Sequence, residues 1–221
     1  PLSLRECEGP VCGPLVMHTW YLQVPWLQRV LLGCRALKAH LELAVQGGDF
    51  VLGVHHELDV VAGGETGHDS IHNGIVEIAK HYPQDTAVMI HDGIRPMIDN
   101  NVIADNLSVY REKGNATVVI PCAEVIFHSD VPTESTQVLD RSKVWRTQTP
   151  QTFRLDKLLW AHEEVVKRGL KSPVATCHLF SLLGETVYFS KGSEKNLKLT
   201  TLDDIEIFKA LLKNEKSSWE K

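Results

Sequence analysis

The chain has 221 residues, 43% of them hydrophobic and 23% charged, and a formal net charge of −5. This composition is typical of a soluble globular protein, and it argues against a general binder of nucleic acid or acidic membranes. No apolar run has the length of a bilayer span, and the first residues lack the order of a signal peptide. The five cysteines contain no C-x-x-C pair, which favours reduced thiols in the cytoplasm over a disulfide framework.

The first half of the chain alternates between predicted strands and helices, although no first strand is evident within residues 1–28. Apolar runs predict strands, and apolar residues at helical spacing predict helices. The predicted strands are 29–34, 58–64, 86–91 and 115–122, and the predicted helices are 35–45, 69–82 and 100–114. Asn100 or Asn101 is expected to cap the last of these helices, and Gly114 to end it. Such alternation implies right-handed βαβ units in a mostly parallel sheet with helices on both faces.

The alternation stops at residues 121–150, where two β-like runs flank the polar turn SDVPTEST. This pattern predicts an extended hairpin arm instead of another crossover. The remaining elements are predicted as helices at 155–169, 174–184 and 200–214, a strand at 186–192 and a frayed tail at 215–221. We expect residues 1–221 to form a single domain that includes the arm.

Two stretches combine a strand end with chemistry-bearing residues. In AGGETGHDSIHNG, from Ala62 to Gly74, glycines precede a helix start, an arrangement that admits a planar base or an anion; taken alone, a plain turn and cap is the simpler interpretation. In HDGIRP, Asp92 is placed to hold a metal ion on a phosphate chain, and Arg95 to take a phosphoryl oxygen. The alternative for the second stretch is a turn in which Arg95 neutralises Asp92.

Cations gather in two further stretches. Arg141, Lys143 and Arg146 lie on or beside the predicted arm, either as a solvated edge or as a means of reaching a phosphate in a neighbouring subunit. Lys195 and Lys198 fall between the last strand and the last helix, where Lys198 is placed to meet developing charge on a phosphoryl group.

In order and spacing, GGETGHDSIHNG, HDGIRP, TQTPQTF and NLKLTTLDD resemble the cytidylyltransferases that activate methylerythritol phosphate or ribitol phosphate, over about residues 60–213. The resemblance implies an α/β, Rossmann-like three-layer nucleotidyltransferase fold with a mostly parallel sheet. It also implies a protruding β-arm at 121–150 that exchanges with a partner to form a homodimer.

The resemblance further implies CTP and a polyol phosphate as substrates and Mg²⁺ as cofactor, with in-line attack on the α-phosphorus and loss of pyrophosphate. Catalysis would then be positioning and charge stabilisation. The residues that the resemblance assigns are Asp92, Arg95 and Lys198 to catalysis, Asp92 also to the metal, Gly64, Glu65 and Ser70 to the cytosine pocket, and Arg141 and Thr200 to substrate binding.

The chain departs from the family pattern at its beginning. The family's glycine-rich loop, A-G-G-x-G-x-R-M, and its P-K-Q lysine are not found, and Leu2 aligns with that lysine. Val125 stands where the family often has threonine, and residues 176–178 lack an expected acid. These departures leave open a catalytically impaired, N-terminally truncated copy that acts as a dimer partner.

Two further alternatives remain. We favour methylerythritol phosphate as the polyol substrate because that branch is larger, with ribitol phosphate as the alternative.

A metal hydrolase is suggested by acidic and imidazole side chains within residues 55–72. These side chains belong to His55, His56, Glu57, His68, Asp69 and His72. The His68–His72 spacing suits one helix face, but H-E-x-x-H is absent, and solvent-facing histidines are the simpler interpretation.

Overall fold

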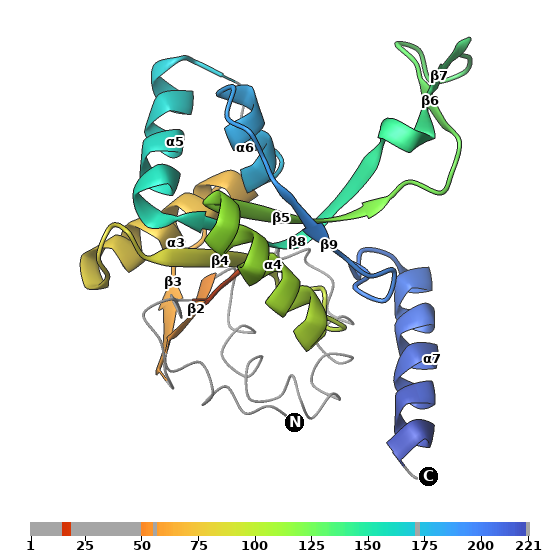
Figure 1. Ribbon diagram of the computed structural model, residues 1–221, viewed down its shortest axis with the longest axis horizontal. Helices are drawn as coiled ribbons and strands as arrows, with labels where there is room; N and C mark the ends of the chain where they lie inside the picture. Colours follow the sequence, from red (N-terminus) through yellow and green to blue (C-terminus); the bar gives the residue numbers. More distant parts are fainter. Residues whose placement is uncertain (1–14, 19–49, 55–56, 171–172, 220–221) are drawn as a thin grey trace.

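The computed structural model describes residues 15–18, 50–54, 57–170 and 173–219. The predicted strand at 29–34, the predicted helix at 35–45, Leu2, His55 and His56 lie outside these residues. The described residues form a seven-stranded sheet in the order β3-β2-β1-β4-β8-β5-β9 (Figure 1). Its strands are β1 (Leu15–His18), β2 (Phe50–Val54), β3 (Glu57–Val61), β4 (Ala87–Asp92), β5 (Asn115–Pro121), β8 (Trp145–Arg154) and β9 (Phe189–Lys191).

The sheet is mixed in its pairing. β1 pairs parallel with β4, and β5 with β9, whereas β2 and β8 run antiparallel to both of their neighbours. All strands except β2 and β8 therefore point the same way, which agrees with the predicted mostly parallel α/β fold. β1 corrects the expectation that residues 1–28 hold no strand. Its four residues, LVMH, are too short a run to stand out in the sequence.

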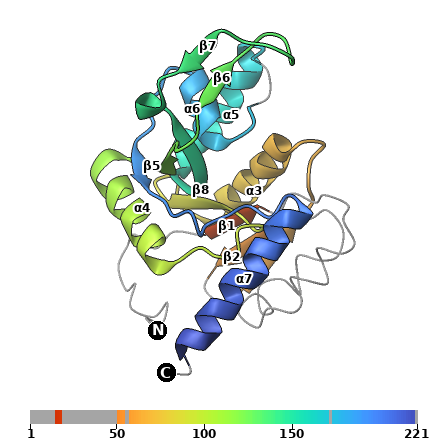
Figure 2. The same cartoon turned by 90° about the vertical axis from the view of Figure 1, so that its right-hand side faces the viewer.

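Helices cover both faces of the sheet (Figures 1 and 2). They are α3 (Gly67–His81), α4 (Asn100–Lys113), α5 (Leu155–Lys167), α6 (Thr176–Leu182) and α7 (Leu202–Trp219). The N-cap of α4 is Asp99, whose carboxylate accepts from the Asn101 and Val102 N–H groups, and not the predicted Asn100 or Asn101, while Gly114 ends the helix with φ 86° as expected. α7 continues to Trp219, so the tail predicted to fray is helical through most of its length.

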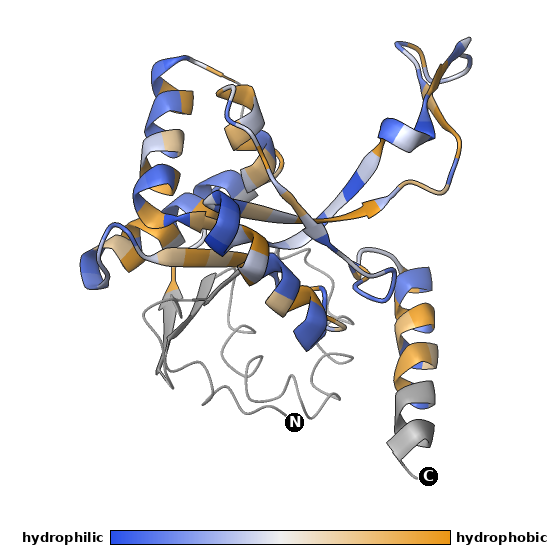
Figure 3. Ribbon diagram, in the orientation of Figure 1, coloured by the Kyte–Doolittle hydropathy of each residue, from blue (hydrophilic) through white to orange (hydrophobic). Residues whose placement is uncertain are grey.

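The main core lies between β4, β8, α3, α5 and α6. It includes Val88, Ile90 and Phe153 from the sheet with Ile75 and Leu158 from the helices. Figure 3 shows apolar residues along the central strands and polar residues on the outer turns of the helices.

The opposite face of the sheet is covered by α4. Phe153 and Thr152 alternate along β8, and the amide of Asn106 in α4 bonds both Thr152 and Ser190. These bonds hold β8 and β9 against α4, which forms the helical layer on this face of the sheet.

A second, two-stranded sheet projects from the body between β5 and β8 (Figure 1). It pairs β6 (Ile126–His128) with β7 (Gln137–Leu139), and a short 3-10 turn, η2 (Arg141–Lys143), leads back toward β8. Apolar side chains on it are exposed, among them Phe127 at 59% and Val138 at 56%. None of the helices among the described residues is both long and apolar enough to cross a bilayer.

Candidate active site

A carboxylate and two cations meet where β4 ends; we call Asp92, Arg95 and Lys198 the strand-end triad. Residues 92–95 form a turn closed by the bond from the Arg95 N–H to the Asp92 carbonyl, 2.9 Å. Arg95 Nε donates to Asp92 Oδ2 at 3.0 Å, and Lys198 Nζ lies 3.3 Å from the same oxygen. The Asp92 and Arg95 side chains are only 13% and 11% exposed. The triad carries one net positive charge in a confined place, which suits a phosphate group.

Hydrogen bonds from the 92–95 turn and from β8 hold the segment that carries Lys198. Arg95 Nη1 donates to the Asn196 carbonyl at 2.8 Å, and the buried Asn196 amide donates to the Thr149 carbonyl at 2.8 Å. The Leu199 N–H donates to the Ile94 carbonyl at 2.9 Å. Lys198 is thus brought to Asp92 by backbone contacts on either side of it.

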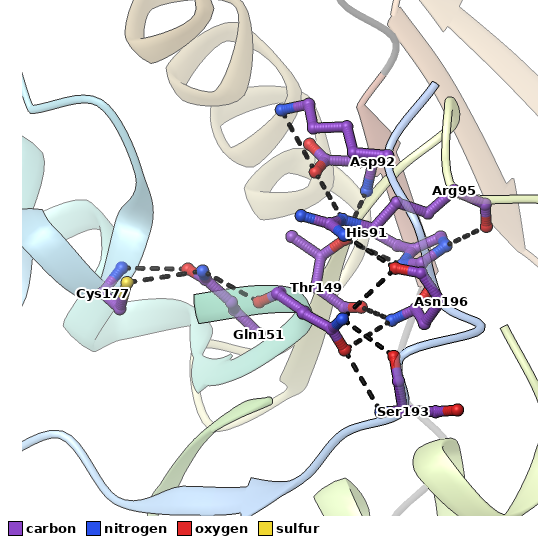
Figure 4. Close-up of polar contacts among 10 residues, drawn as sticks. His91, Asp92, Arg95, Thr149, Gln151, Cys177, Ser193 and Asn196 are labelled. Carbon is purple, nitrogen blue, oxygen red and sulfur yellow. Dashed lines mark hydrogen bonds and ion pairs between the residues drawn. The ribbon is translucent and has the colours of Figure 1, made fainter. Parts of the chain in front are cut away.

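Behind the turn, His91 and Thr149 form a buried pair (Figure 4). The Thr149 hydroxyl accepts from the Asp92 N–H at 2.9 Å and lies 3.0 Å from His91 Nδ1, while His91 Nε2 lies 3.3 Å from the Arg95 carbonyl. Burial lowers the pKa of His91 to about 4, so its imidazole is neutral at physiological pH. Both ends of the 92–95 turn are tied to this pair.

The loop before α3 and the first turn of this helix hold the residues assigned to the cytosine pocket. The Ser70 hydroxyl accepts from the Gly64 N–H at 2.9 Å and donates to the Thr66 carbonyl at 2.9 Å, and Thr66 and Asp69 form a capping box. A Cβ on Gly64 would lie 2.2 Å from the Cβ of Asp69, so only glycine fits there. Gly64 in the loop is therefore tied to Ser70 in the first turn of α3, and Glu65 between them is exposed.

This loop and the strand-end triad lie at the same edge of the sheet. β3 and β4 point the same way and are separated by β2 and β1. Three strand spacings of about 4.8 Å place their carboxyl ends about 14 Å apart. An open α/β sheet binds ligands at this edge.

The other two predicted substrate-binding residues, Arg141 and Thr200, form their hydrogen bonds with groups outside the strand-end triad. Arg141 is exposed on η2 of the projecting sheet, where its guanidinium donates to the Ala123 carbonyl at 3.3 Å. Thr200 lies two residues after Lys198, and its hydroxyl donates to Asp204 Oδ2 at 2.9 Å at the start of α7. The substrate roles of both remain predictions.

Sequence reasoning gave no role to His91, Thr149 or Gln148, although the motifs HDGIRP and TQTPQTF contain them. Gln148 is 6% exposed and donates to the Ser193 carbonyl at 2.9 Å. The available signal was that polar residues interrupt otherwise apolar strands. A buried polar side chain needs a partner, and here the partners are site segments.

The histidines of the metal-hydrolase alternative are arranged differently from the expectation of solvent-facing rings. His68 and His72 of α3 are partly buried, and both stack on His162 of α5, with ring centroids 4.3 and 4.9 Å apart. Burial lowers the pKa of His162 to about 3. Among the described residues, no group of three or more His, Cys, Asp or Glu is placed to hold a metal ion.

Asp92 fits only one kind of metal site. Its carboxylate stands beside two cations, so it does not form a resident site built from protein ligands alone. Mg²⁺ is commonly held by one or two carboxylates together with substrate phosphates. The residues present therefore suit a magnesium ion that arrives with a polyphosphate.

Comparisons with known proteins fit this geometry. A profile of the 2-C-methyl-D-erythritol 4-phosphate cytidylyltransferase (IspD) family matches residues 28–214. The chain belongs to this family.

Relatives of this cytidylyltransferase-family chain carry both substrate names. It is 35% identical to a ribitol-5-phosphate cytidylyltransferase of Lacticaseibacillus paracasei over 71% of this chain and 68% of that protein. It is 34% identical to a 2-C-methyl-D-erythritol 4-phosphate cytidylyltransferase of Clostridium acetobutylicum over 70% of this chain and 66% of that protein. The chain spans about two thirds of these relatives, between 63% and 68% for the ribitol-5-phosphate enzymes compared.

Solved structures of the family share the fold. The 2-C-methyl-D-erythritol 4-phosphate cytidylyltransferase of Francisella tularensis superposes with a TM-score of 0.63 at 25% identity, over 71% of this chain and 73% of that one. A 4-diphosphocytidyl-2C-methyl-D-erythritol synthase from Anaerococcus prevotii gives a TM-score of 0.68 at 17% identity, over 90% of this chain and 96% of that one. The Rossmann-like nucleotidyltransferase fold expected from the sequence is thereby confirmed.

Proposed function

We propose that this chain transfers CMP from CTP to a polyol phosphate and releases pyrophosphate. An oxygen of the polyol phosphate attacks the α-phosphorus of CTP, and the bond from that phosphorus to the β-phosphate oxygen breaks. The observation that carries the proposal is the strand-end triad, because it places two cations at the sheet edge that also holds the loop before α3.

The triad's part in the reaction follows from its charges. Arg95 and Lys198 would hold phosphoryl oxygens and stabilise the charge that develops as pyrophosphate leaves. Asp92 orients Arg95 through its Nε contact and would hold Mg²⁺, which neutralises charge on the triphosphate. The loop at Gly64 and Ser70 would receive the cytosine. No covalent intermediate on the protein is required.

The exposed apolar side chains on β6 and β7 support a contact between two copies of the chain. In such a homodimer, Arg141 would reach the polyol phosphate bound to the partner. The thiols of Cys122 and Cys177 are free, which suits a reducing compartment, and we place the enzyme in the cytoplasm.

The direct test measures pyrophosphate release from CTP with ribitol 5-phosphate and, separately, with 2-C-methyl-D-erythritol 4-phosphate. Lys198→Met should lower kcat/KM by about two to three orders of magnitude, the loss typical of a missing charge-stabilising group. Lys195→Met is the matched control, because Lys195 is an exposed lysine three residues away. The absence of turnover with both polyols would overturn the proposal and favour the dimer-partner alternative.

A further inference from the structure

We propose that His91 is a positioning residue for this reaction: its Nε2–H holds the Arg95 end of the 92–95 turn directly, and its Nδ1 holds the Asp92 end through the Thr149 hydroxyl. This inference rests on the proposed function, because it concerns how Arg95 and Asp92 are held toward the phosphates. His91 is 4% exposed and lies behind the turn, so it acts through these residues and does not touch substrate.

The hydrogen-bond partners fix where the proton sits. A backbone carbonyl only accepts, so the contact of His91 Nε2 with the Arg95 carbonyl at 3.3 Å requires a proton on Nε2. A neutral imidazole with that proton has an acceptor at Nδ1, to which the Thr149 hydroxyl donates at 3.0 Å. The same hydroxyl oxygen accepts from the Asp92 N–H at 2.9 Å. Every donor in this chain of bonds therefore has one acceptor.

The clamp acts on the two ends of one turn. It fixes the Asp92 N–H at the first residue and the Arg95 carbonyl at the fourth, while the bond from the Arg95 N–H to the Asp92 carbonyl closes the turn itself. The geometry of this turn sets the positions of the Asp92 carboxylate and the Arg95 guanidinium, which bond to each other. The carboxylate also contacts Lys198. A misplacement of about 1 Å in such a group lowers the rate by about 100-fold.

His162 is a second buried histidine, and it shows that a buried imidazole in this protein does not need hydrogen bonds at both ring nitrogens. It is 3% exposed, like His91, yet neither of its ring nitrogens has a hydrogen-bond partner among the described residues. Its ring stacks on His68 and His72 of α3, and among the described residues it has no hydrogen bond or ion pair with the strand-end triad. The two buried histidines thus form a matched pair, one with both nitrogens engaged at the site and one with neither.

The kinetic test compares His91→Phe with His162→Phe in the pyrophosphate assay. We expect His91→Phe to lower kcat by about 10- to 100-fold with a smaller change in the KM for CTP, and His162→Phe to leave kcat within about 2-fold. Thr149→Val should resemble His91→Phe, and Thr149→Ser, which keeps the hydroxyl, should restore most of the activity. Equal losses from His91→Phe and His162→Phe, with matched losses of stability, would overturn the inference by showing a merely structural role.

A spectroscopic test does not depend on turnover. Long-range ¹H–¹⁵N NMR spectra of the full chain distinguish the two imidazole tautomers, and His91→Phe assigns the resonance. A proton on Nε2 supports the clamp, whereas an Nδ1–H tautomer, which leaves Nε2 without a proton, overturns it. If the chain released no pyrophosphate and His91 were the Nε2–H tautomer, the proposed function would fail while the clamp on the turn would stand.

Discussion

Replacing Asp92 with asparagine removes the negative charge that lies between two cations. Arg95 Nε and Lys198 Nζ lie 3.0 and 3.3 Å from one Asp92 oxygen, and the Asp92 and Arg95 side chains are nearly buried. Two unit charges 4 Å apart interact by about 4 kcal/mol at an effective dielectric constant of about 20. The asparagine retains an acceptor, and Lys198 is 34% exposed and partly solvated. We therefore expect a loss of about 3 kcal/mol in the free energy of unfolding, toward the lower end of what breaking a buried pair costs.

Thermal unfolding measures this loss. A domain of this size shifts its Tm by about 2 to 4 °C per kcal/mol, so Asp92→Asn should unfold about 6 to 12 °C below the wild type. Asp130→Asn is the control, because Asp130 is exposed on the projecting sheet and such a change is worth about 0.5 kcal/mol or less.

A second measurement separates the electrostatic cause from general damage. In the wild type, Asp92 competes with any anion for Arg95 and Lys198. Without that competition, inorganic tripolyphosphate in the absence of magnesium should raise the Tm of Asp92→Asn more than that of the wild type. Pyrophosphate release should nevertheless fall by about 100-fold, because Arg95 loses the carboxylate that orients it. A variant with the wild-type Tm and no gain from tripolyphosphate would refute the arrangement of one carboxylate between two cations.

Three further predictions follow from single residues. The pKa of His162 is lowered from 6.5 to about 3, so the unfolded chain binds one more proton at this residue between these pH values. As the pH falls below about 6, the stability of the wild type should therefore decline by about 1.4 kcal/mol per pH unit more than that of His162→Phe, measured by urea unfolding. Gly64→Ala drives a methyl group against Asp69. Calorimetry should show CTP binding weakened by about tenfold, or about 1.4 kcal/mol. An unchanged affinity for CTP would argue against a base pocket at Gly64. Arg141→Ala should leave the Tm unchanged, because the side chain is exposed, while initial rates show a higher KM for the polyol phosphate and the same KM for CTP.

The helices and most strands from β3 onward could be predicted because their signals are local, whereas residues 145–150 of β8 were expected in the arm. Apolar spacing, a cap and a glycine determined α3, α4 and α5 to within a few residues. The antiparallel pairings of β8 with β4 and β5 were not predictable in this way. They arise because the chain leaves β5, forms the projecting sheet and returns between two strands that already point the same way. Strand order of this kind depends on contacts between distant segments, which a pattern along the chain does not encode.

The strand-end triad shows where local inference ends within the site itself. Asp92 and Arg95 are three residues apart at a strand exit, so a turn that pairs them follows from the sequence HDGIRP. Lys198 reaches the same carboxylate through long-range contacts: Arg95 holds the Asn196 carbonyl across 101 residues of chain, and the Leu199 N–H donates to the Ile94 carbonyl. Asn196 in turn depends on Thr149, which also bonds His91 and the Asp92 N–H. The two sides of the triad thus depend on different atoms of Thr149: its hydroxyl holds the turn that carries Arg95, and its carbonyl holds Asn196 beside Lys198. Thr149→Val should therefore disturb the 92–95 turn and leave the Asn196 contact with the backbone in place.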